Sequence, residues 1–184
     1  MVDLLDLQKS FILAHLGEGD IAADFTMGNG HDTEFLCRTV GENGHVYAFD
    51  IQAAALESTA KNLENAGVCK NYTLIHDSHH NAKNYIKEKI KAGMFNLGWL
   101  PGSGNKAVTT KLDTTLIAVR DAIDMLDSDG IILIAVYPGH EEGTREGQAL
   151  SDMLSEYDRR KFSVSKFRII NSPTSPYFMI IENR

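Results

Sequence analysis

The sequence predicts a three-layer αβα sandwich, an α/β fold in which helices cover both faces of a mostly parallel sheet. Apolar runs alternate with helix-like segments along most of the chain, and two further runs close it as an antiparallel pair, which gives seven expected strands. The most apolar run, Ile131 to Val136, has the composition of a strand in the middle of a parallel sheet. The 184 residues contain no linker, repeat or low-complexity segment, so we expect one domain over residues 1–184.

Each expected element has its own signal in the sequence. The expected helices have apolar residues three and four positions apart, and several end at a glycine. In chain order they cover residues 2–16, 31–41, 53–66, 83–91, 109–126 and 144–157. The expected strands are short apolar runs bounded by turn residues. In chain order they cover residues 21–25, 46–49, 72–75, 94–97, 131–136, 162–170 and 177–181. The polar segment 127–130 is expected to be a turn.

Composition and charge exclude several classes of function. The formal net charge of −7 argues against broad non-specific binding of nucleic acid, although a local basic patch can still meet an RNA. Three groups of cations are candidates for such a patch: Lys83, Lys87, Lys89 and Lys91; Lys106 and Lys111; and Arg159, Arg160 and Lys161 with Lys166 and Arg168. We expect neither a membrane span nor a signal peptide. The two cysteines form no disulfide framework and no zinc pattern, so we expect a reducing, cytoplasmic setting.

The first predicted strand leads into a glycine-containing turn. The run I-A-A-D ends in Asp24, and the turn that follows contains Gly28 and Gly30 and opens a helix. A strand, a glycine turn and a helix in this order are typical of a nucleotide-cofactor cradle. The dinucleotide fingerprint would need a third glycine where Thr33 stands. Asp32 near the helix start disfavours a pyrophosphate and suits a cationic cofactor such as S-adenosylmethionine, which has a positive sulfonium and amino group.

The second predicted strand also ends in an acid. Asp50 lies about 20 residues beyond the glycines, where α/β cofactor folds place a carboxylate that binds the ribose hydroxyls. A carboxylate can accept two hydrogen bonds from the vicinal hydroxyls of a ribose. The alternative is that Asp50 caps the helix that follows.

A polar cluster, H-D-S-H-H, follows the third strand. We interpret it as an adenine site, in which Asp77 accepts a hydrogen bond from the adenine amino group and Ser78 donates one to a ring nitrogen. The alternatives are a metal site and a helix cap formed by Ser78. Adjacent residues cannot all face one ion, so we predict no metal, and we expect His80 on the surface.

The segment F-N-L-G-W-L-P-G follows the fourth strand and suits methyl transfer to nitrogen. The carbonyl of Asn96 can accept an N–H bond and align the nitrogen lone pair, and Trp99 can stack on a planar base or hold a cation. His140 is a candidate base or proton relay. The alternatives are that Asn96 satisfies loop backbone groups and that Trp99 fills the core.

With these segments the chain resembles the class I S-adenosylmethionine-dependent methyltransferases, which have a Rossmann-like fold. More narrowly, it is similar to the YtqB-like rRNA methylase family, which is associated with the tRNA methyltransferase MnmM. The segments that carry the resemblance are D-F-T-M-G-N-G-H-D-T, A-F-D-I-Q, H-D-S-H, N-L-G-W-L-P-G, Y-P-G-H-E-E-G and N-S-P-T-S-P-Y. They follow one another along nearly the whole chain.

The resemblance implies methylation of the aminomethyl nitrogen of 5-aminomethyl-(2-thio)uridine at the tRNA wobble position. It also implies a homodimer, with the tRNA anticodon stem-loop as substrate. The implied cofactor contacts are Met27, Asn29, Asp32, Asp50, Gln52, Ser78 and His79. The chain departs from the family pattern at Trp99, where tyrosine is usual, and at Asn105, where an acid is usual.

Three other functions remain open at this point. The first is methylation of another nucleic acid or of a small amine, because the fold does not define the substrate. The second is a non-catalytic module that binds the cofactor or RNA. The third is a dinucleotide oxidoreductase, which the missing third glycine disfavours.

Overall fold

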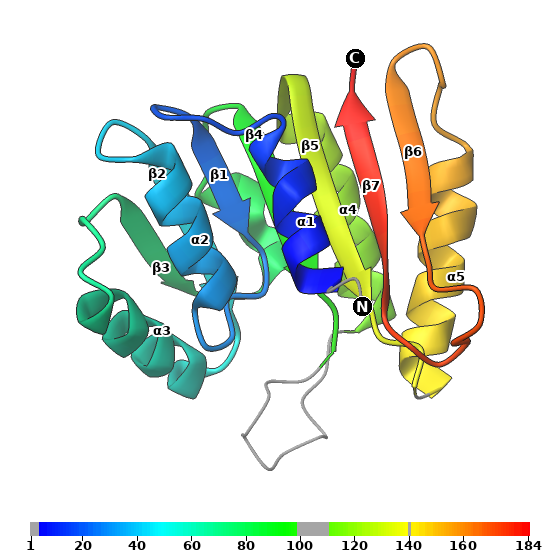
Figure 1. Ribbon diagram of the computed structural model, residues 1–184, viewed down its shortest axis with the longest axis horizontal. Coiled ribbons are helices and arrows are strands. Elements are labelled where there is room, and N and C mark those ends of the chain that lie inside the picture. The colour runs from blue at the N-terminus through cyan, green and yellow to red at the C-terminus, as the bar shows by residue number, and fades with distance from the viewer. Residues whose placement is uncertain (1–3, 99–110, 140) are drawn as a thin grey trace.

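The computed structural model describes residues 4–98, 111–139 and 141–184. A seven-stranded sheet forms its centre, with strand order β3-β2-β1-β4-β5-β7-β6 (Figure 1). β7 runs antiparallel to both of its neighbours, whereas the other pairings are parallel. This arrangement confirms the predicted fold class.

The elements follow in one alternating series until the last two strands. The helices are α1 (Leu4–Leu13), α2 (His31–Val40), α3 (Ala53–Asn65), the 3-10 helix η1 (His79–Asn84), α4 (Leu112–Met125) and α5 (Glu141–Ser155). The strands are β1 (Ile21–Asp24), β2 (His45–Asp50), β3 (Tyr72–His76), β4 (Ile90–Asn96), β5 (Leu126–Val136), β6 (Phe162–Phe167) and β7 (Tyr177–Asn183). None of the helices in these described ranges is long and apolar enough to cross a membrane.

Two hydrophobic layers hold the helices on the sheet. On one face α1 and α2 bury residues such as Ile12 and Leu36 against β1, β4, β5 and β7. On the other face η1, α4 and α5 pack against the larger layer, which includes Phe25 and Phe95 with their rings stacked at 4.2 Å. Figure 1 shows α1, α2 and α3 in front of the sheet, with α4 and α5 behind it.

Two predicted elements were wrong. Residues 83–91 were expected to be a helix, but the 3-10 helix ends at Asn84 and β4 begins at Ile90. Buried Ile90 pairs with the first residue of β5, and this pairing overrides the polar character of the segment, on which the predicted helix rested. Gly93 accordingly lies within β4, where a Cβ would come within 3.0 Å of the Phe25 ring, and does not end a helix.

The expected turn at residues 127–130 is instead a bulge within β5. Ile90 pairs with Leu126 and Ala92 pairs with Ile131, so four residues of β5 lie opposite a single residue of β4. Asp129 has a φ of 52°, which lets the strand bend without breaking. The remaining boundaries differ from the predictions by only a few residues.

Gly30 fixes the approach of α2 to α3. Its φ is 83°, and a Cβ at this position would lie 2.9 Å from the Cα of Thr59. Both the backbone conformation and the contact therefore require glycine.

Replacing Gly30 with alanine should lower the free energy of unfolding by about 2–4 kcal/mol, because strain and a backbone clash add. Gly19→Ala is the matched control, since Gly19 has a φ of 87° with nothing within 4 Å of its Cβ position. That variant should lose only about 1–2 kcal/mol. Urea unfolding of both variants gives the comparison, and equal losses would show that the contact with Thr59 has no cost.

Candidate active site

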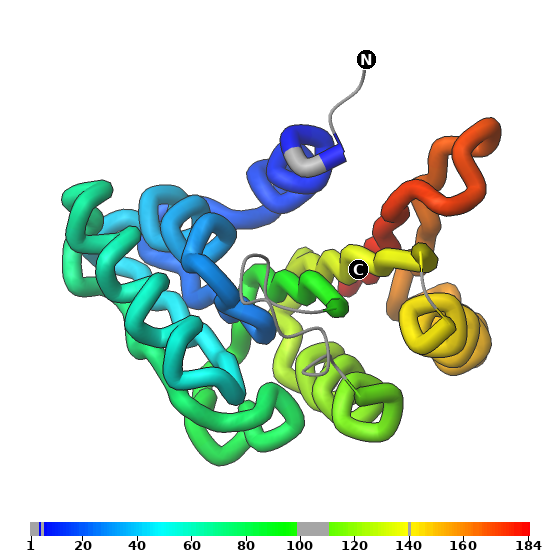
Figure 2. Tube along the Cα trace, turned by 90° about the horizontal axis from the view of Figure 1, so that it is seen from below, coloured from blue at the N-terminus to red at the C-terminus, as the bar shows by residue number. Residues whose placement is uncertain are grey.

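The carboxyl ends of the parallel strands bring the predicted site residues to one edge of the sheet. Asp24, Asp50 and Asn96 are the last residues of β1, β2 and β4. The loops and first helical residues that follow these strands and β3 hold the other predicted cofactor residues: Met27, Gly28, Asn29, Gly30, Asp32, Gln52, Asp77, Ser78 and His79. Figure 2 views the molecule from this side. Trp99, Asn105 and His140 lie outside the described residues.

Asp24 is buried and holds the turn after β1. Its carboxylate accepts hydrogen bonds from the Oγ1 of Thr33 at 2.7 Å and from the backbone N–H of Thr26 at 3.1 Å. Burial, and then the nearby charge of Asp32, raise the pKa of Asp24 to about 7. The contact of Asp24 with a cofactor stays a prediction, because the two groups that donate hydrogen bonds to its carboxylate are both residues of the chain itself.

Asp50 links the turn after β1 to the start of α3. One carboxylate oxygen accepts the backbone N–H of Gly28 at 3.2 Å, and the other accepts that of Gln52 at 2.9 Å. Gln52, not Asp50, is the N-cap residue of α3. A carboxylate offers about four lone-pair sites, so Asp50 retains acceptor capacity for the hydroxyls of a ribose. Asn29 is held nearby by the Oγ of Ser58, at 3.0 Å from its Oδ1.

The loop after β3 has its own hydrogen-bond network. The carboxylate of Asp77 accepts hydrogen bonds from the Nδ2 of Asn81, the Oη of Tyr85 and its neighbouring backbone N–H, and these bonds lower its pKa. Ser78 occupies the N-cap position of η1, but its side chain makes no capping bond and instead contacts the Nδ1 of His80 at 2.7 Å. His80 is half-buried rather than fully on the surface.

His79 is buried and neutral. Its Nδ1 lies 3.1 Å from the carbonyl oxygen of Phe25, which can only accept, so Nδ1 carries the proton. Burial lowers the pKa of His79 to about 4. Nε2 is therefore a hydrogen-bond acceptor inside the protein, and no described residue donates to it.

Asn96 is held by two polar contacts at the end of β4. Its backbone N–H donates to the Oγ1 of Thr26 at 2.7 Å, and its Nδ2 donates to the carboxylate of Asp32. The second bond fixes the side-chain amide, because a carboxylate can only accept from it. The Oδ1 of Asn96 is buried, and none of the described residues donates to it.

These features fit a cationic cofactor and an amine substrate. Three carboxylates, from Asp24, Asp32 and Asp50, lie around one glycine turn, and burial raises the pKa of each. A positively charged ligand would relieve the cost of burying these charges together. The two orphaned acceptors, on His79 and Asn96, would each be satisfied by an N–H or O–H donor. Within the described residues no group of three metal-ligating side chains could hold a metal ion.

The structure adds residues that the sequence did not single out. Thr26 positions the backbone of Asn96, and Thr33, noted only because it is not glycine, binds the buried carboxylate of Asp24. Each contact joins residues that are not neighbours in the sequence. The one feature of the sequence that could have indicated a role for Thr26 is its position just after the end of β1.

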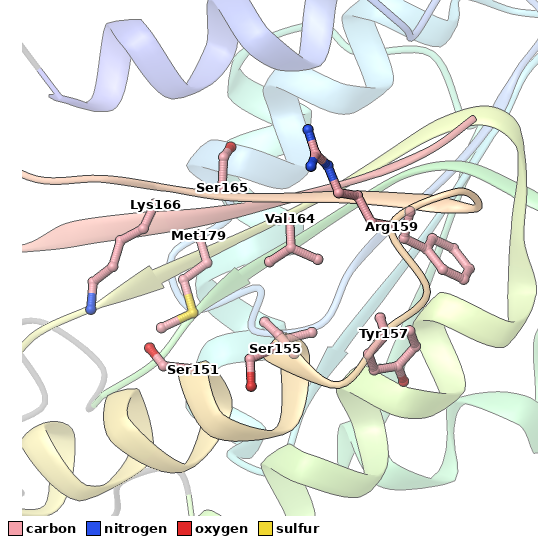
Figure 3. Close-up of a pocket in the computed structure, with 10 residues that line it drawn as sticks. Ser151, Ser155, Tyr157, Arg159, Val164, Ser165, Lys166 and Met179 are labelled. Carbon is pink, nitrogen blue, oxygen red and sulfur yellow. The ribbon is translucent and has the colours of Figure 1, made fainter.

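A cavity of about 340 Å³ lies elsewhere, between α5 and the last two strands (Figure 3). Its lining includes Leu154, Val164 and Met179 and contains none of the predicted site residues. The polar edge of the sheet, not this cavity, has the acceptors and charges expected of the cofactor site.

Comparisons with known proteins show which family this chain resembles. A family model described as "Putative rRNA methylase" matches residues 46–183. A "putative rRNA-methylase" structure from Clostridium thermocellum is 38% identical with a TM-score of 0.96, and the match covers 100% of this chain and 99% of that one. A "putative methyltransferase" from Streptococcus mutans, solved in complex with SAH, is 35% identical with a TM-score of 0.90 and the same coverage.

A plant protein is similar over most of this chain. It is the chloroplastic tRNA (mnm(5)s(2)U34)-methyltransferase of Arabidopsis thaliana, 35% identical over 177 residues. The match covers 91% of this chain and 64% of that protein's length. The family match, together with a relative of 35% identity solved in complex with SAH, confirms the predicted cofactor, S-adenosylmethionine. This chain belongs to the rRNA methylase family and has the fold of the S-adenosylmethionine-dependent methyltransferases.

Proposed function

We propose that this chain methylates the aminomethyl nitrogen of 5-aminomethyl-(2-thio)uridine at the wobble position of tRNA. The observation that carries the proposal is the buried Oδ1 of Asn96, an acceptor fixed in direction by Asp32 and without a described donor. An amine substrate would supply the missing N–H. The similarity to a plant enzyme named for this modification supports the choice of substrate.

The protein's own residues would act by holding and aligning the reactants. When bound, S-adenosylmethionine supplies a methyl group on a positively charged sulfur. Asp50 and the turn at Gly28 would hold its ribose, and the carboxylate of Asp32 would face its positive charge. Asn96 would accept one N–H of the substrate and direct the nitrogen lone pair, since alignment supplies much of the rate for a good leaving group. The amine must be neutral to react, and His140 remains the predicted proton acceptor.

Replacing Asp50 with alanine should weaken cofactor binding by about 1–3 kcal/mol, or roughly 5- to 150-fold in Kd, through loss of a charged hydrogen-bond acceptor. Calorimetric titration with SAH measures the change. Asp77→Ala is a useful comparison. Asp77 directly follows the neighbouring strand β3, and it is also predicted to bind the cofactor, through adenine. An unchanged Kd in Asp50→Ala would leave Asp50 only its hydrogen bonds to Gly28 and Gln52.

The function is tested by mass spectrometry of tRNA nucleosides. The protein is incubated with S-adenosylmethionine and tRNA that carries 5-aminomethyluridine, with tRNA that lacks this modification as the control. We expect one added methyl group on the modified nucleoside and none in the control tRNA. Methylation of both would indicate another RNA target, and methylation of neither, with cofactor binding intact, would indicate a small amine or a binding module. The homodimer and the cytoplasmic location stay predictions, the first of which sedimentation can measure.

A further inference from the structure

The chain is acidic overall, so an RNA substrate needs a local cationic surface. The three candidate groups of cations can now be placed on the fold. What distinguishes them is the edge of the sheet on which they lie and whether their charges are already neutralised. The active-site edge is the one where β1, β4, β5 and β6 end.

The lysines of the first group donate to acceptors of the protein itself, and Lys87 donates to the backbone carbonyl of Lys83 at 2.8 Å. Lys83 forms ion pairs with Asp121 and Asp124 at 2.6 and 2.9 Å. Lys89 and Lys91 precede or begin β4, at the opposite edge, and donate to the backbone carbonyls of residues 124 and 128. Of the second group, Lys106 lies outside the described residues, and Lys111 is a single exposed cation at the N-cap position of α4.

The third group is divided between the two ends of β6. Arg159 and Lys161 precede the strand, and Lys166 and Arg168 lie at or just beyond its end. Figure 3 shows Lys166 and Arg159 at opposite ends of β6, with Val164 between them. Within this group, only Lys166 and Arg168 therefore lie at the active-site edge.

Lys166 and Arg168 are held together on one aromatic ring. The Nζ of Lys166 lies 4.1 Å from the ring centroid of Tyr177, and the Cζ of Arg168 lies 5.9 Å from it. Arg168 also donates to the carbonyl oxygen of Pro173 at 2.6 Å. Both side chains are exposed, and no carboxylate of the described residues forms an ion pair with either. Two ordered like charges without a counter-ion favour an anion from outside the protein.

The sheet register places the end of β6 three strands from the proposed site of chemistry. Asn96 pairs with Ala135, Ala135 with Phe178, and Phe178 with Phe167, so one row of residues crosses four strands. Three strand spacings correspond to about 14 Å. A nucleotide whose base reaches Asn96 would therefore have neighbouring phosphates within reach of the cations at the end of β6.

We propose that Lys166 and Arg168, ordered on Tyr177, bind the phosphate backbone of the RNA whose base enters the active site. This inference rests on the proposed function, because it assumes an RNA substrate. Arginine and lysine contacts of this kind position a nucleic acid without reading its sequence.

Two double variants of the full chain test the proposal. Lys166→Ala/Arg168→Ala removes the pair, and Arg159→Ala/Lys161→Ala removes the same two residue types from the other end of the same strand. Lys161 is a close match, because its Nζ also lies over an aromatic ring, 5.0 Å from that of Phe162. Each variant changes the formal net charge from −7 to −9. Fluorescence anisotropy with a labelled, unmodified anticodon stem-loop RNA gives the Kd over a range of salt concentrations.

We expect the first variant to raise the Kd for RNA by about ten- to a hundredfold and to lower the salt slope by about 2, one for each lost phosphate contact. The second variant should change the Kd less than about twofold. The charge-preserving exchange Lys166→Arg/Arg168→Lys should retain RNA binding, which separates loss of charge from loss of folding.

An equal rise in the Kd for RNA in both alanine variants would overturn the proposal, because the loss of net charge alone would then explain the weaker binding. An unchanged Kd in the first variant, or a wild-type protein that binds no RNA, would also overturn it. If the nucleoside assay shows no methylation but the two alanine variants differ in Kd as expected, the proposed modification is wrong and the phosphate-binding role of Lys166 and Arg168 is supported.

Discussion

Replacing Asn96 with alanine is expected to lower kcat by about 10²–10³-fold while leaving the Kd for S-adenosylmethionine unchanged. The side-chain amide is the acceptor that would orient the substrate nitrogen, and its Oδ1 has no described donor. Without it the amine can still bind near the methyl group but loses its alignment. Single-turnover methylation of tRNA carrying 5-aminomethyluridine measures the loss, and calorimetry with SAH measures cofactor affinity.

Asn71→Ala is a matched control for this variant. Asn71 is also buried, its Nδ2 donates to the carbonyls of Cys37 and Gly41, and its Oδ1 has no described donor. It precedes β3, at the opposite edge from the active site. Its replacement should cost stability and leave kcat unchanged at a temperature where the variant is folded. A normal kcat in Asn96→Ala would remove Asn96 from the mechanism and return it to a structural role at the end of β4.

The strand-end pattern predicted that these polar residues would gather, because parallel strands all deliver their last residues to one edge of the sheet. Asp24, Asp50 and Asn96 each follow an apolar run, and each lies at that edge. Alternation of apolar runs with helices was likewise sufficient for the fold class. The predicted helix at 83–91 was wrong because a polar segment is compatible with an exposed helix, whereas the buried pairing of Ile90 with β5 is a long-range contact that the sequence pattern does not show.

The contacts that complete the site could not be predicted in the same way. The bond between Asn96 and Asp32 joins residues 64 positions apart, and it depends on how β4 lies beside the turn after β1. The same is true of the bond between Thr26 and Asn96. Similarly, the basic residues near the C-terminus formed one group in the sequence, but β6 separates them to opposite edges of the sheet.

Replacing Asp32 with asparagine is expected to lower kcat by roughly ten- to a hundredfold at saturating cofactor, which corresponds to the loss of one charge-assisted hydrogen bond. Ionised Asp32 can only accept, so it forces the Nδ2 of Asn96 toward itself and leaves Oδ1 for the substrate. An asparagine at position 32 can accept or donate. The amide of Asn96 would then adopt both orientations, and in one of them it would present a donor to the substrate N–H.

A double-mutant cycle separates this positioning role from direct contact of Asp32 with the cofactor. If Asp32 acts on kcat through Asn96, then adding Asp32→Asn to Asn96→Ala should cost no further kcat, and the coupling should equal the whole effect of the single variant. Any direct contact with the positive cofactor would appear separately, as a higher Kd for S-adenosylmethionine in both backgrounds. Additive losses of kcat would show that Asp32 acts independently of Asn96. Full coupling would mean that the reaction depends on a carboxylate that need not touch the substrate, because its effect is exerted through the direction of one amide.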